Sequence, residues 1–381
     1  MKIALVKKRY SLRHGGSERY CVVLARRLRQ HGHDVAVIGE RIDEELAGEV
    51  EFHKVPVNRL TSWTRNRSFA ENAGRVAKAE RFDLVYGLGR SFGLDAVRVT
   101  ERLQSHWVNV YYRQPANRWL QKLNPRHRTL IDLERTIYRD DQTRRVVTQS
   151  WLDRKLVQEY YQIPEEKIRT IHNGVDITAF HPGVREEANT IREEFGLSAE
   201  EPLLVFASMD FEGKGLRSIL KALKETHHRD CRLIVLGTGP ERRFRRIAEE
   251  LGVGSRVIFA GRRSDISRFY GAGDLFLLPT AYEPFPNVVL EAMACGLPVM
   301  TTTTSGGADI LEPGKNGYLI SEVHAVGEMV ECLNQHFDSS ASTREDMARH
   351  CWATAQEMTI EKNIEKTLEL FEEVLSEKFR V

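Results

Sequence analysis

The sequence predicts an α/β protein with two doubly wound, Rossmann-like domains that face each other across a cleft. Short apolar runs of strand length alternate with helical patterns along the chain, which is typical of mostly parallel sheets covered by helices. This alternation is interrupted around residues 168–202 by Asn-Gly, a proline and a charged stretch, the expected domain boundary. A length of 381 residues with 41% hydrophobic residues is sufficient for two cores.

The first domain is expected to cover residues 1–172. An apolar run at 3–6, a helical pattern closed by Gly32 and a second apolar run at 35–38 form a βαβ unit. Gly15 and Gly16 lie in the loop before this helix, where backbone amides can approach a ligand closely. A plain turn is the alternative, and GxGxxG is absent. Further strands are expected at 84–86 and 145–148.

The second domain is expected to cover residues 173–359. Its strands are predicted at 203–207, 232–236, 257–260, 275–278 and 298–301, with helical patterns between them. The remaining segment, 360–381, is predicted to be a helix that packs back on the N-terminal domain. Its expected apolar face consists of Ile360, Ile364, Leu368, Phe371 and Leu375.

Composition excludes several function classes. With 56 basic and 54 acidic residues the formal charge is +2, so general affinity for nucleic acid is not expected. The five cysteines are scattered without a CxxC pair, which fits free thiols in a reducing compartment. The N-terminus has four consecutive apolar residues, too few for a signal peptide. A cytoplasmic protein is therefore expected, with peripheral contact to the inner membrane left open.

Sequence motifs exclude further enzyme classes. The segment around Gly-Lys at 213–214 is not a P-loop, because Ser208 replaces the first glycine and Gly215 replaces Ser or Thr. HExxH, a clustered Cys/His set and a GxSxG elbow are all absent, so the sequence offers no support for a metallohydrolase or a serine hydrolase.

The remaining motifs form an inventory suited to binding phosphate. Lys214, Gly237 and Arg262 each follow a predicted strand of the second domain, where a diphosphate could be held. Solvated side chains and ordinary turns are the alternatives for each residue taken alone. The loops that carry these residues are expected at one edge of the sheet, so together they indicate a site.

The stretch 282–296, YEPFPNVVLEAMACG, adds two carboxylates to this inventory. Glu283 lies in a loop after the predicted strand 275–278, and Glu291 lies about one turn inside a helix that begins at Asn287. The free amides of this helix terminus favour an anion. The stretch therefore suits a phosphorylated ligand whose hydroxyl groups bind the carboxylates.

These residues carry a resemblance to the retaining glycosyltransferases of the GT-B fold, in the large family four. The most specific motif is Glu, seven residues, Glu, present as Glu283 and Glu291. Supporting passages are HGGSER, HNGVD, GKG, GTGP and EPGKNGYL. Within the family, the GLD passage at 93–95 most resembles the lipopolysaccharide core alpha-1,3-glucosyltransferases that act on inner-core heptose.

The resemblance implies a role for each matching residue at the donor site. Glu291 would bond the ribose hydroxyls of a nucleotide sugar, and Glu283 the hydroxyls of the transferred sugar. Amides of Phe285, Asn287 and Val288 would hold the sugar or the distal phosphate. Lys214 and the amides of Gly15 and Gly16 would stabilise the departing diphosphate, so that neither a metal ion nor a cofactor is needed.

One departure concerns the partner of Lys214. Most relatives place an arginine five residues before this lysine or next to it, where Met209 and Gly213 stand here. Arg217 or Arg262 is expected to take over this function.

On the reacting side, the resemblance places an acid or a histidine after the strand 84–86, near the anomeric carbon of the donor. Register with the GLD passage makes Glu101 the preferred candidate and His106 the second. A solvated carboxylate on a helix is the alternative for Glu101. A single carboxylate fits same-face attack as well as a covalent intermediate.

Residues 107–139 form the most basic stretch of the chain, with aromatic residues between the cations. This composition suits the headgroup layer of an anionic membrane. A solvated helix pair is the alternative, and single-stranded nucleic acid is disfavoured by the low net charge.

The sequence therefore predicts transfer of a hexose, glucose from UDP-glucose, to a lipopolysaccharide core or another glycolipid. The alternatives are a family-four enzyme that uses GDP-mannose or UDP-GlcNAc in polysaccharide synthesis, a GT-B sugar-nucleotide epimerase, and a regulatory protein that binds nucleotide sugars without catalysis.

Overall fold

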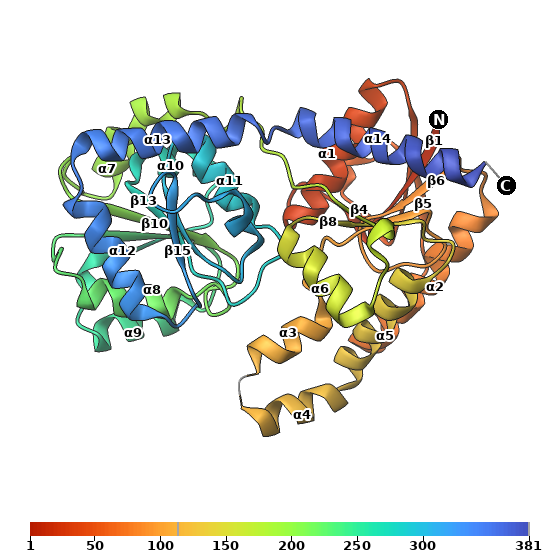
Figure 1. Cartoon of the computed structure of the whole chain (residues 1–381), viewed down its shortest axis with the longest axis horizontal. Coiled ribbons are helices and arrows are strands. Elements are labelled where there is room, and N and C mark those ends of the chain that lie inside the picture. Colours follow the sequence, from red (N-terminus) through yellow and green to blue (C-terminus); the bar gives the residue numbers. More distant parts are fainter. Residues whose placement is uncertain (113, 380–381) are drawn as a thin grey trace. The chain divides into compact units, whose positions relative to one another are not determined.

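The computed structural model describes residues 1–112 and 114–379, and the chain divides into two compact units (Figure 1). Unit 1 comprises Met1–His172 together with Glu361–Val381, and unit 2 comprises Asn173–Ile360. The chain thus leaves unit 1, builds unit 2 completely and returns to unit 1 for its last helix.

Unit 1 is built on a seven-stranded parallel sheet of order β5-β3-β1-β6-β7-β8-β9. Strands β3 and β5 extend the sheet on one side of β1, and the strands from β6 to β9 extend it on the other side. The sheet therefore has its topological switch point between β1 and β6. The strands are β1 (Lys2–Val6), β3 (Asp34–Gly39), β5 (Glu51–Lys54), β6 (Leu84–Gly87), β7 (Ala96–Arg98), β8 (Arg145–Thr148) and β9 (Ile168–Thr170), and a separate small sheet joins β2 (Arg9–Tyr10) to β4 (Arg41–Ile42).

The helices of unit 1 begin at residues suited to capping. The Thr61 hydroxyl accepts from the Thr64 amide at 3.1 Å, and the Ser150 hydroxyl accepts from the Asp153 amide at 3.0 Å. The helices are α1 (Gly16–Gln30), α2 (Ser62–Ala79), α3 (Gln104–Tyr111), α4 (Pro115–Leu123), α5 (Pro125–Arg139), α6 (Trp151–Tyr161) and α14 (Ile360–Lys378), with short 3₁₀ turns η1 (Glu44–Leu46) and η2 (Glu165–Lys167).

Helix α14 packs within unit 1, but its buried face differs from the expected one. Leu368 and Leu375 are half-buried, whereas the buried residues are Asn363, Ile364, Thr367, Leu370, Phe371 and Val374. Polar side chains lie on this face because they find partners: the Asn363 amide donates to the His172 carbonyl at 2.5 Å, and the Thr367 hydroxyl donates to the Asn363 carbonyl at 2.8 Å. A pattern of apolar residues alone therefore predicts a buried face of α14 that is shifted by about one residue from the observed face.

Unit 2 is built on a six-stranded parallel sheet of order β12-β11-β10-β13-β14-β15. Its switch point lies between β10 and β13. The strands are β10 (Leu203–Ser208), β11 (Arg232–Gly237), β12 (Val257–Gly261), β13 (Leu275–Leu278), β14 (Val299–Thr302) and β15 (Gly317–Ile320).

Strands β10, β11 and β13 are almost continuously buried, as expected for a parallel sheet with helices on both faces. The helices are α7 (Ala188–Glu194), α8 (Leu216–Glu225), α9 (Glu241–Glu250), α10 (Ile266–Ala272), α11 (Asn287–Ala294), α12 (Val326–Asp338) and α13 (Ala341–Gln356), with 3₁₀ turns η3 (Pro182–Glu187), η4 (Gly254–Arg256) and η5 (Gly306–Ile310). Two doubly wound parallel sheets confirm the predicted α/β class.

Candidate functional site

Two loops meet at the switch point of unit 2 because their strands are neighbours. The loop after β10 carries Lys214 and the loop after β13 carries Glu283, and β10 pairs with β13. The Ala281 amide donates to the Gly213 carbonyl at 3.1 Å, which joins the loops directly. The Lys214 ammonium donates to the Glu283 carboxylate, and the two side chains are only 11% and 23% exposed. The structure therefore brings together two residues that are 69 positions apart.

Gly215 allows this close approach of the two loops. Its φ of +77° lies in the left-handed region, and a Cβ at this position would stand 2.3 Å from the Pro279 carbonyl oxygen. Gly237, at the end of β11, is similarly constrained: its φ is +108°, and a Cβ would stand 1.9 Å from the Ser208 carbonyl oxygen. Both turns accept only glycine without rearrangement of the backbone.

Helix α11 presents its N-terminus after the Glu283 loop. The residue before the helix is Pro286, and the amides of Asn287 and Val288 belong to the first turn, whose N–H groups have no partner within a helix. Phe285 is buried at 4% exposure, and the Asn287 side chain accepts a bond of 2.6 Å from the Asn173 amide. These contacts hold the helix terminus in place. Glu291 lies one turn further along and is half-buried.

The structure separates the two arginines proposed as partners of Lys214. Arg217 lies in the first turn of α8, directly after the Lys214 loop, and its Nε donates to Glu212 at 3.3 Å. Arg262 is exposed and follows β12, which is two strands away from β10 in the sheet. Arg217 is therefore the better placed of the two.

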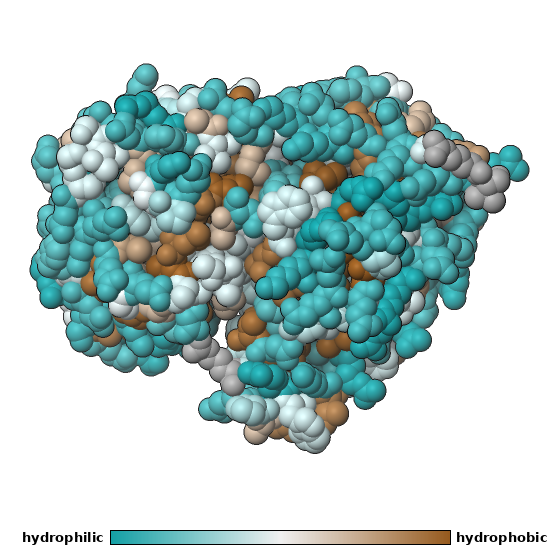
Figure 2. All heavy atoms as spheres, viewed as in Figure 1, coloured by the Kyte–Doolittle hydropathy of each residue, from teal (hydrophilic) through white to brown (hydrophobic). Residues whose placement is uncertain are grey.

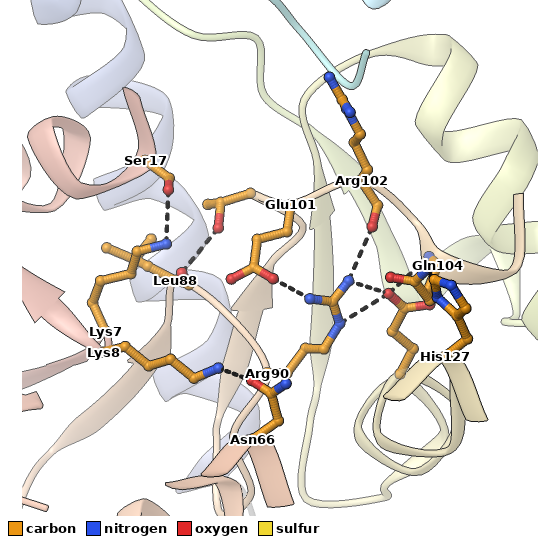
Figure 3. Close-up of polar contacts among 12 residues, drawn as sticks. Lys7, Lys8, Ser17, Asn66, Leu88, Arg90, Glu101, Arg102, Gln104 and His127 are labelled. Atoms are coloured by element: carbon orange, nitrogen blue, oxygen red, sulfur yellow. Dashed lines mark hydrogen bonds and ion pairs between the residues drawn. The ribbon is translucent and has the colours of Figure 1, made fainter. Parts of the chain in front are cut away.

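Unit 1 has a charged cluster at its own switch point (Figure 3). Lys7 and Lys8 follow β1, Arg90 follows β6, and Glu101 follows β7. Figure 3 shows the Glu101 carboxylate with the two lysines on one side and Arg90 on the other. Arg90 Nη1 donates to Glu101, and Lys7 Nζ donates to the Ser17 hydroxyl at 2.8 Å. Glu101 therefore lies in a loop, which corrects the alternative of a solvated carboxylate on a helix.

The charges around Glu101 keep it ionised. Burial alone would raise the pKa of Glu101, but the charges of Arg90, Lys7 and Lys8 and the bond from Arg90 hold this pKa at about 2. The side chain retains 40% exposure. Glu101 is therefore an accessible carboxylate that is negative at every physiological pH, able to stabilise positive charge and unable to donate a proton.

Arg90 is fixed from its other side by Glu134 of α5. Arg90 Nε donates to Glu134 at 2.9 Å, and the backbone amide of Gln104 donates to both Glu134 oxygens at 3.0 Å. Tyr161 also donates to this carboxylate, which is fully buried. Sequence reasoning missed Arg90 and assigned no role to Glu134. The signal for Arg90 was its position just after a strand at the switch point.

The other candidates in unit 1 have different surroundings. His106 of α3 packs edge-on against the Tyr160 ring at 5.8 Å, and its Nδ1 lies 3.3 Å from the Tyr160 hydroxyl. Burial lowers the pKa of His106, so the ring is neutral at pH 7. Gly15 is the N-cap of α1 and Gly16 its first residue, as expected for amides at a helix terminus.

Helix α4 has no buried residue. Its apolar residues Trp119, Leu120 and Leu123 are 63%, 58% and 50% exposed, and Arg118 and Lys122 lie among them. Figure 2 shows apolar atoms at the lower edge of the view, where Figure 1 places α4. Arg113, part of the predicted basic stretch, lies outside the described residues. Within residues 1–112 and 114–379, every helix is too short or too polar to cross a membrane.

Two doubly wound parallel sheets, each with charged residues at its switch point, are the architecture of the GT-B fold, which many sugar-transferring enzymes share. Family models match both halves: Glycosyltransferase Family 4 over residues 14–179 and Glycosyl transferases group 1 over residues 187–351. The chain belongs to the family-four glycosyltransferases with the GT-B fold.

Several relatives place the chain within this family. The chain is 27% identical over 332 residues to the lipopolysaccharide glucosyltransferase WaaG of Escherichia coli K12, covering 86% of this chain and 87% of the relative. It is 23% identical over 326 residues to N-acetyl-alpha-D-glucosaminyl L-malate synthase of Bacillus anthracis, covering 80% of each protein.

Solved structures agree with this assignment. The crystal structure of WaaG matches with a TM-score of 0.83 at 25% identity, covering 97% of this chain and 99% of that chain. A structure of Anabaena Alr3699/HepE in complex with UDP and glucose matches with a TM-score of 0.72 at 19% identity, covering 98% and 99%. The second match supports the fold alone.

Proposed function

We propose that the protein is a retaining hexosyltransferase that moves glucose from UDP-glucose to a lipopolysaccharide core or a similar glycolipid acceptor. The observation that carries this proposal is the contact of Lys214 with Glu283 at the switch point of unit 2. Glu283 lies in the loop that leads to the N-terminus of α11. A cation, a carboxylate and free helix amides suit a ligand with both phosphates and hydroxyls. Similarity to WaaG, a lipopolysaccharide glucosyltransferase, favours this donor and acceptor.

Each donor-site residue has a role in this proposal. Glu291 accepts bonds from the ribose hydroxyls, and Glu283 accepts bonds from the donor sugar. Lys214, the first amides of α11, and the Gly15 and Gly16 amides stabilise the diphosphate as it departs, with Arg217 assisting. Lys214 then exchanges its present partner Glu283 for phosphate oxygens. Because cations and amides neutralise the leaving group, the reaction requires neither a metal ion nor a cofactor.

Glu101 acts on the reacting sugar in this proposal. Positive charge develops at the anomeric carbon in an oxocarbenium-like transition state, and an ionised carboxylate stabilises this charge. The low pKa of Glu101 keeps it in the ionised form. A carboxylate of this kind suits same-face attack and a covalent intermediate equally well.

The stretch 107–139 is proposed to bind an anionic membrane surface, at the cytoplasmic face of the inner membrane. Exposed Trp119 and Leu120 on α4 can enter the headgroup layer, while Arg118 and Lys122 neutralise acidic lipids. Flotation with vesicles that contain or lack phosphatidylglycerol tests this part. Binding to the anionic vesicles is expected, and equal, negligible binding to both kinds would contradict it.

A thermal-shift screen of the purified protein against UDP-, GDP- and ADP-sugars tests the donor. A ligand at 100 times its dissociation constant stabilises the folded protein by about 2.7 kcal/mol, so UDP-glucose is expected to raise the melting temperature visibly. Stabilisation by GDP-mannose or UDP-GlcNAc alone would select another donor.

Activity assays test the reaction itself. Addition of EDTA should leave the rate of sugar transfer unchanged. Formation of an epimer of the nucleotide sugar without an acceptor would contradict the assignment as a transferase.

A further inference from the structure

A basic cavity of about 400 Å³ lies in unit 1, between the loop after β1 and the first turn of α2. Apart from Lys8, whose charge also acts on Glu101, it is formed by residues that the proposed reaction does not use. The charged side chains that line it are Lys8, Arg9, Arg59, Arg65 and Arg126, and a single carboxylate, Glu18. The charge of Glu18 is already compensated, because Lys7 Nζ lies 3.7 Å from it and the Ser17 hydroxyl donates to it at 2.9 Å. The cavity therefore has an excess of positive charge.

Two of the arginines, Arg59 and Arg65, are held in place by a buried carboxylate. Glu40, at 2% exposure, accepts a bond of 3.0 Å from Arg59 and one of 2.7 Å from Arg65. Burial alone would raise the pKa of Glu40, but the bonds and charges of Arg65 and Arg59 lower it, so the carboxylate is ionised. A guanidinium carries five N–H donors, so each arginine that is bonded to Glu40 has others left for a ligand. The cavity is thus organised before any ligand enters.

Lys8 connects the cavity with the Glu101 site. It lines the cavity, donates to the Asn66 side chain and lies 5.6 Å from the centre of the Phe69 ring. Burial lowers the pKa of Lys8, and the nearby charge of Glu101 opposes this shift. An anion held by Lys8 therefore lies next to the carboxylate proposed to act on the reacting sugar.

We propose that this cavity binds a phosphate group carried by the sugar acceptor and thereby directs an acceptor hydroxyl toward Glu101. Cations from three segments of the chain surround the space, and Thr61 and Ser62 add hydroxyl donors at the α2 terminus. Donors on several sides suit a tetrahedral phosphate better than a planar carboxylate. A volume of about 400 Å³ accommodates a phosphorylated monosaccharide. The identification of the ligand as acceptor rests on the proposed function, whereas phosphate binding does not.

Isothermal titration of the whole protein with inorganic phosphate, glucose 6-phosphate and glucose, at 0.15 M salt, tests the proposal. The two phosphates are expected to bind, and glucose is not. Arg126→Ala and Lys8→Gln should each weaken phosphate binding about tenfold, equivalent to about 1.4 kcal/mol. Arg126 is exposed on α5, so its variant is expected to fold even if Lys8→Gln does not.

Arg67→Ala is the matched control, because it removes one positive charge from α2, the helix whose first turn lines the cavity, at a position outside the cavity. The Arg67 side chain is 67% exposed and pairs with Glu71 at 3.0 Å. The phosphate affinity of the Arg67→Ala variant should differ from that of the wild type by less than twofold. Equal affinities in wild type, Arg126→Ala and Lys8→Gln, or no phosphate binding by the wild type, would overturn the proposal.

Two further arms identify the source of the phosphate. Titration with UDP should give the same affinity in wild type and Arg126→Ala, since a loss in the variant would assign the cavity to the donor diphosphate. Flotation with phosphatidylglycerol vesicles should also be unchanged in Lys8→Gln, since a loss would assign the cavity to a lipid headgroup. If the wild type binds phosphate but no nucleotide sugar, the proposed function fails while the phosphate site stands.

Discussion

Arg90 connects two carboxylates that have opposite surroundings. It bonds Glu101, whose side chain is 40% exposed, and Glu134, which is fully buried. The buried carboxylate also accepts two amide bonds from Gln104, so the position of Arg90 is strongly constrained. In the proposed reaction Arg90 is therefore a positioning residue, because it orients the Glu101 carboxylate and keeps it ionised.

Removal of the Arg90 charge should change the pH dependence of the reaction. A positive neighbour favours the ionised carboxylate, so Arg90→Gln should raise the pKa of Glu101 from about 2. The acid limb of kcat should then appear at higher pH, between about pH 4 and 6. Arg90→Lys should give an intermediate pH profile, because lysine keeps the positive charge but lacks the planar set of N–H donors of the guanidinium. Steady-state rates from pH 4 to 9 measure this effect, and superimposable profiles for wild type and Arg90→Gln would contradict it.

The two carboxylates of unit 2 should produce different kinetic defects. Glu283→Gln is expected to lower kcat by about tenfold to a hundredfold, because a bond to a charged acceptor contributes about 1.5–3 kcal/mol. Glu291→Gln should instead weaken UDP binding by a similar factor, since its proposed partner is the ribose. Steady-state kinetics and UDP titration distinguish the two effects. Transfer near the wild-type rate in both variants would falsify the donor-site assignment.

The sequence indicated the unit 2 site more completely than the unit 1 site. Lys214 and Glu283 each follow a strand with a clear apolar run, so their place at one edge of a parallel sheet could be predicted. Their direct contact could not, because it depends on β13 lying beside β10. Glu134 was not predicted as a site residue because it belongs to a basic helix, and only its burial against Arg90 distinguishes it from a surface charge.

At the scale of elements, the strands missed by sequence reasoning are short or polar. Strand β5 reads EFHK and β7 reads AVR, and neither has an apolar run. The edge strand β5 pairs with β3, which allows polar residues on it. In β7, Arg98 is buried and donates to the Ile171 carbonyl at 2.7 Å. Hydrophobic patterning detects strands that contain an apolar run, and tertiary pairing determines the others.

Helix α4 should determine binding to anionic vesicles. Trp119→Ser with Leu120→Ser removes the two most exposed apolar side chains of the helix, and flotation with phosphatidylglycerol vesicles should fall about tenfold or more. Thermal stability should not change, since α4 buries no residue. Phe379→Ser is the matched control, because Phe379 is 69% exposed at the other end of the chain. Equal flotation of the double variant and this control would exclude α4 from the membrane contact.

Helix α12 should make unit 2 sensitive to acid through His336. This side chain is fully buried, its Nε2 lies 3.1 Å from the Asp274 carbonyl oxygen, and its Nδ1 lies 3.3 Å from the Tyr318 hydroxyl. Burial lowers the pKa of His336 from 6.5 to about 4. The unfolded chain therefore takes up a proton at a higher pH than the folded one.

Stability should consequently be lost as the pH falls from about 6.5 to about 4, by about 3 kcal/mol in total. His336→Gln should flatten this part of the pH dependence, although it lowers stability at pH 7. Urea unfolding of the whole protein at several pH values measures the slope. An equally steep loss in His336→Gln would assign the acid sensitivity to other groups.

At the scale of the whole molecule, the last helix belongs to the unit that the chain built first. Phe371 of α14 contacts the Tyr86 ring edge-on at 5.0 Å, and Arg145 of β8 bonds Glu373 at 2.6 Å. Lys378 bonds Asp95 at 3.0 Å. Unit 1 is therefore complete only after unit 2 has been synthesised.

This order predicts that the two units differ in their ability to fold alone. Residues 173–360 contain their own sheet and core and should unfold cooperatively as a separate protein. Residues 1–172 lack α14, which buries Ile364, Leu370, Phe371 and Val374 in the full chain. Each such side chain contributes about 1.5–3 kcal/mol, and the sum is comparable with the net stability of about 5–15 kcal/mol of a whole domain.

The isolated segment 1–172 should therefore be unfolded or melt far below the full chain, and addition of a peptide of residues 358–381 should restore part of its structure. Circular dichroism melts of both segments, with and without the peptide, measure this difference. Phe371→Ala in the full chain should destabilise unit 1 by about 3–5 kcal/mol, whereas Glu372→Ala, on the exposed side of the helix, should have little effect. If residues 1–172 melt alone at the temperature of the full chain, α14 does not stabilise unit 1.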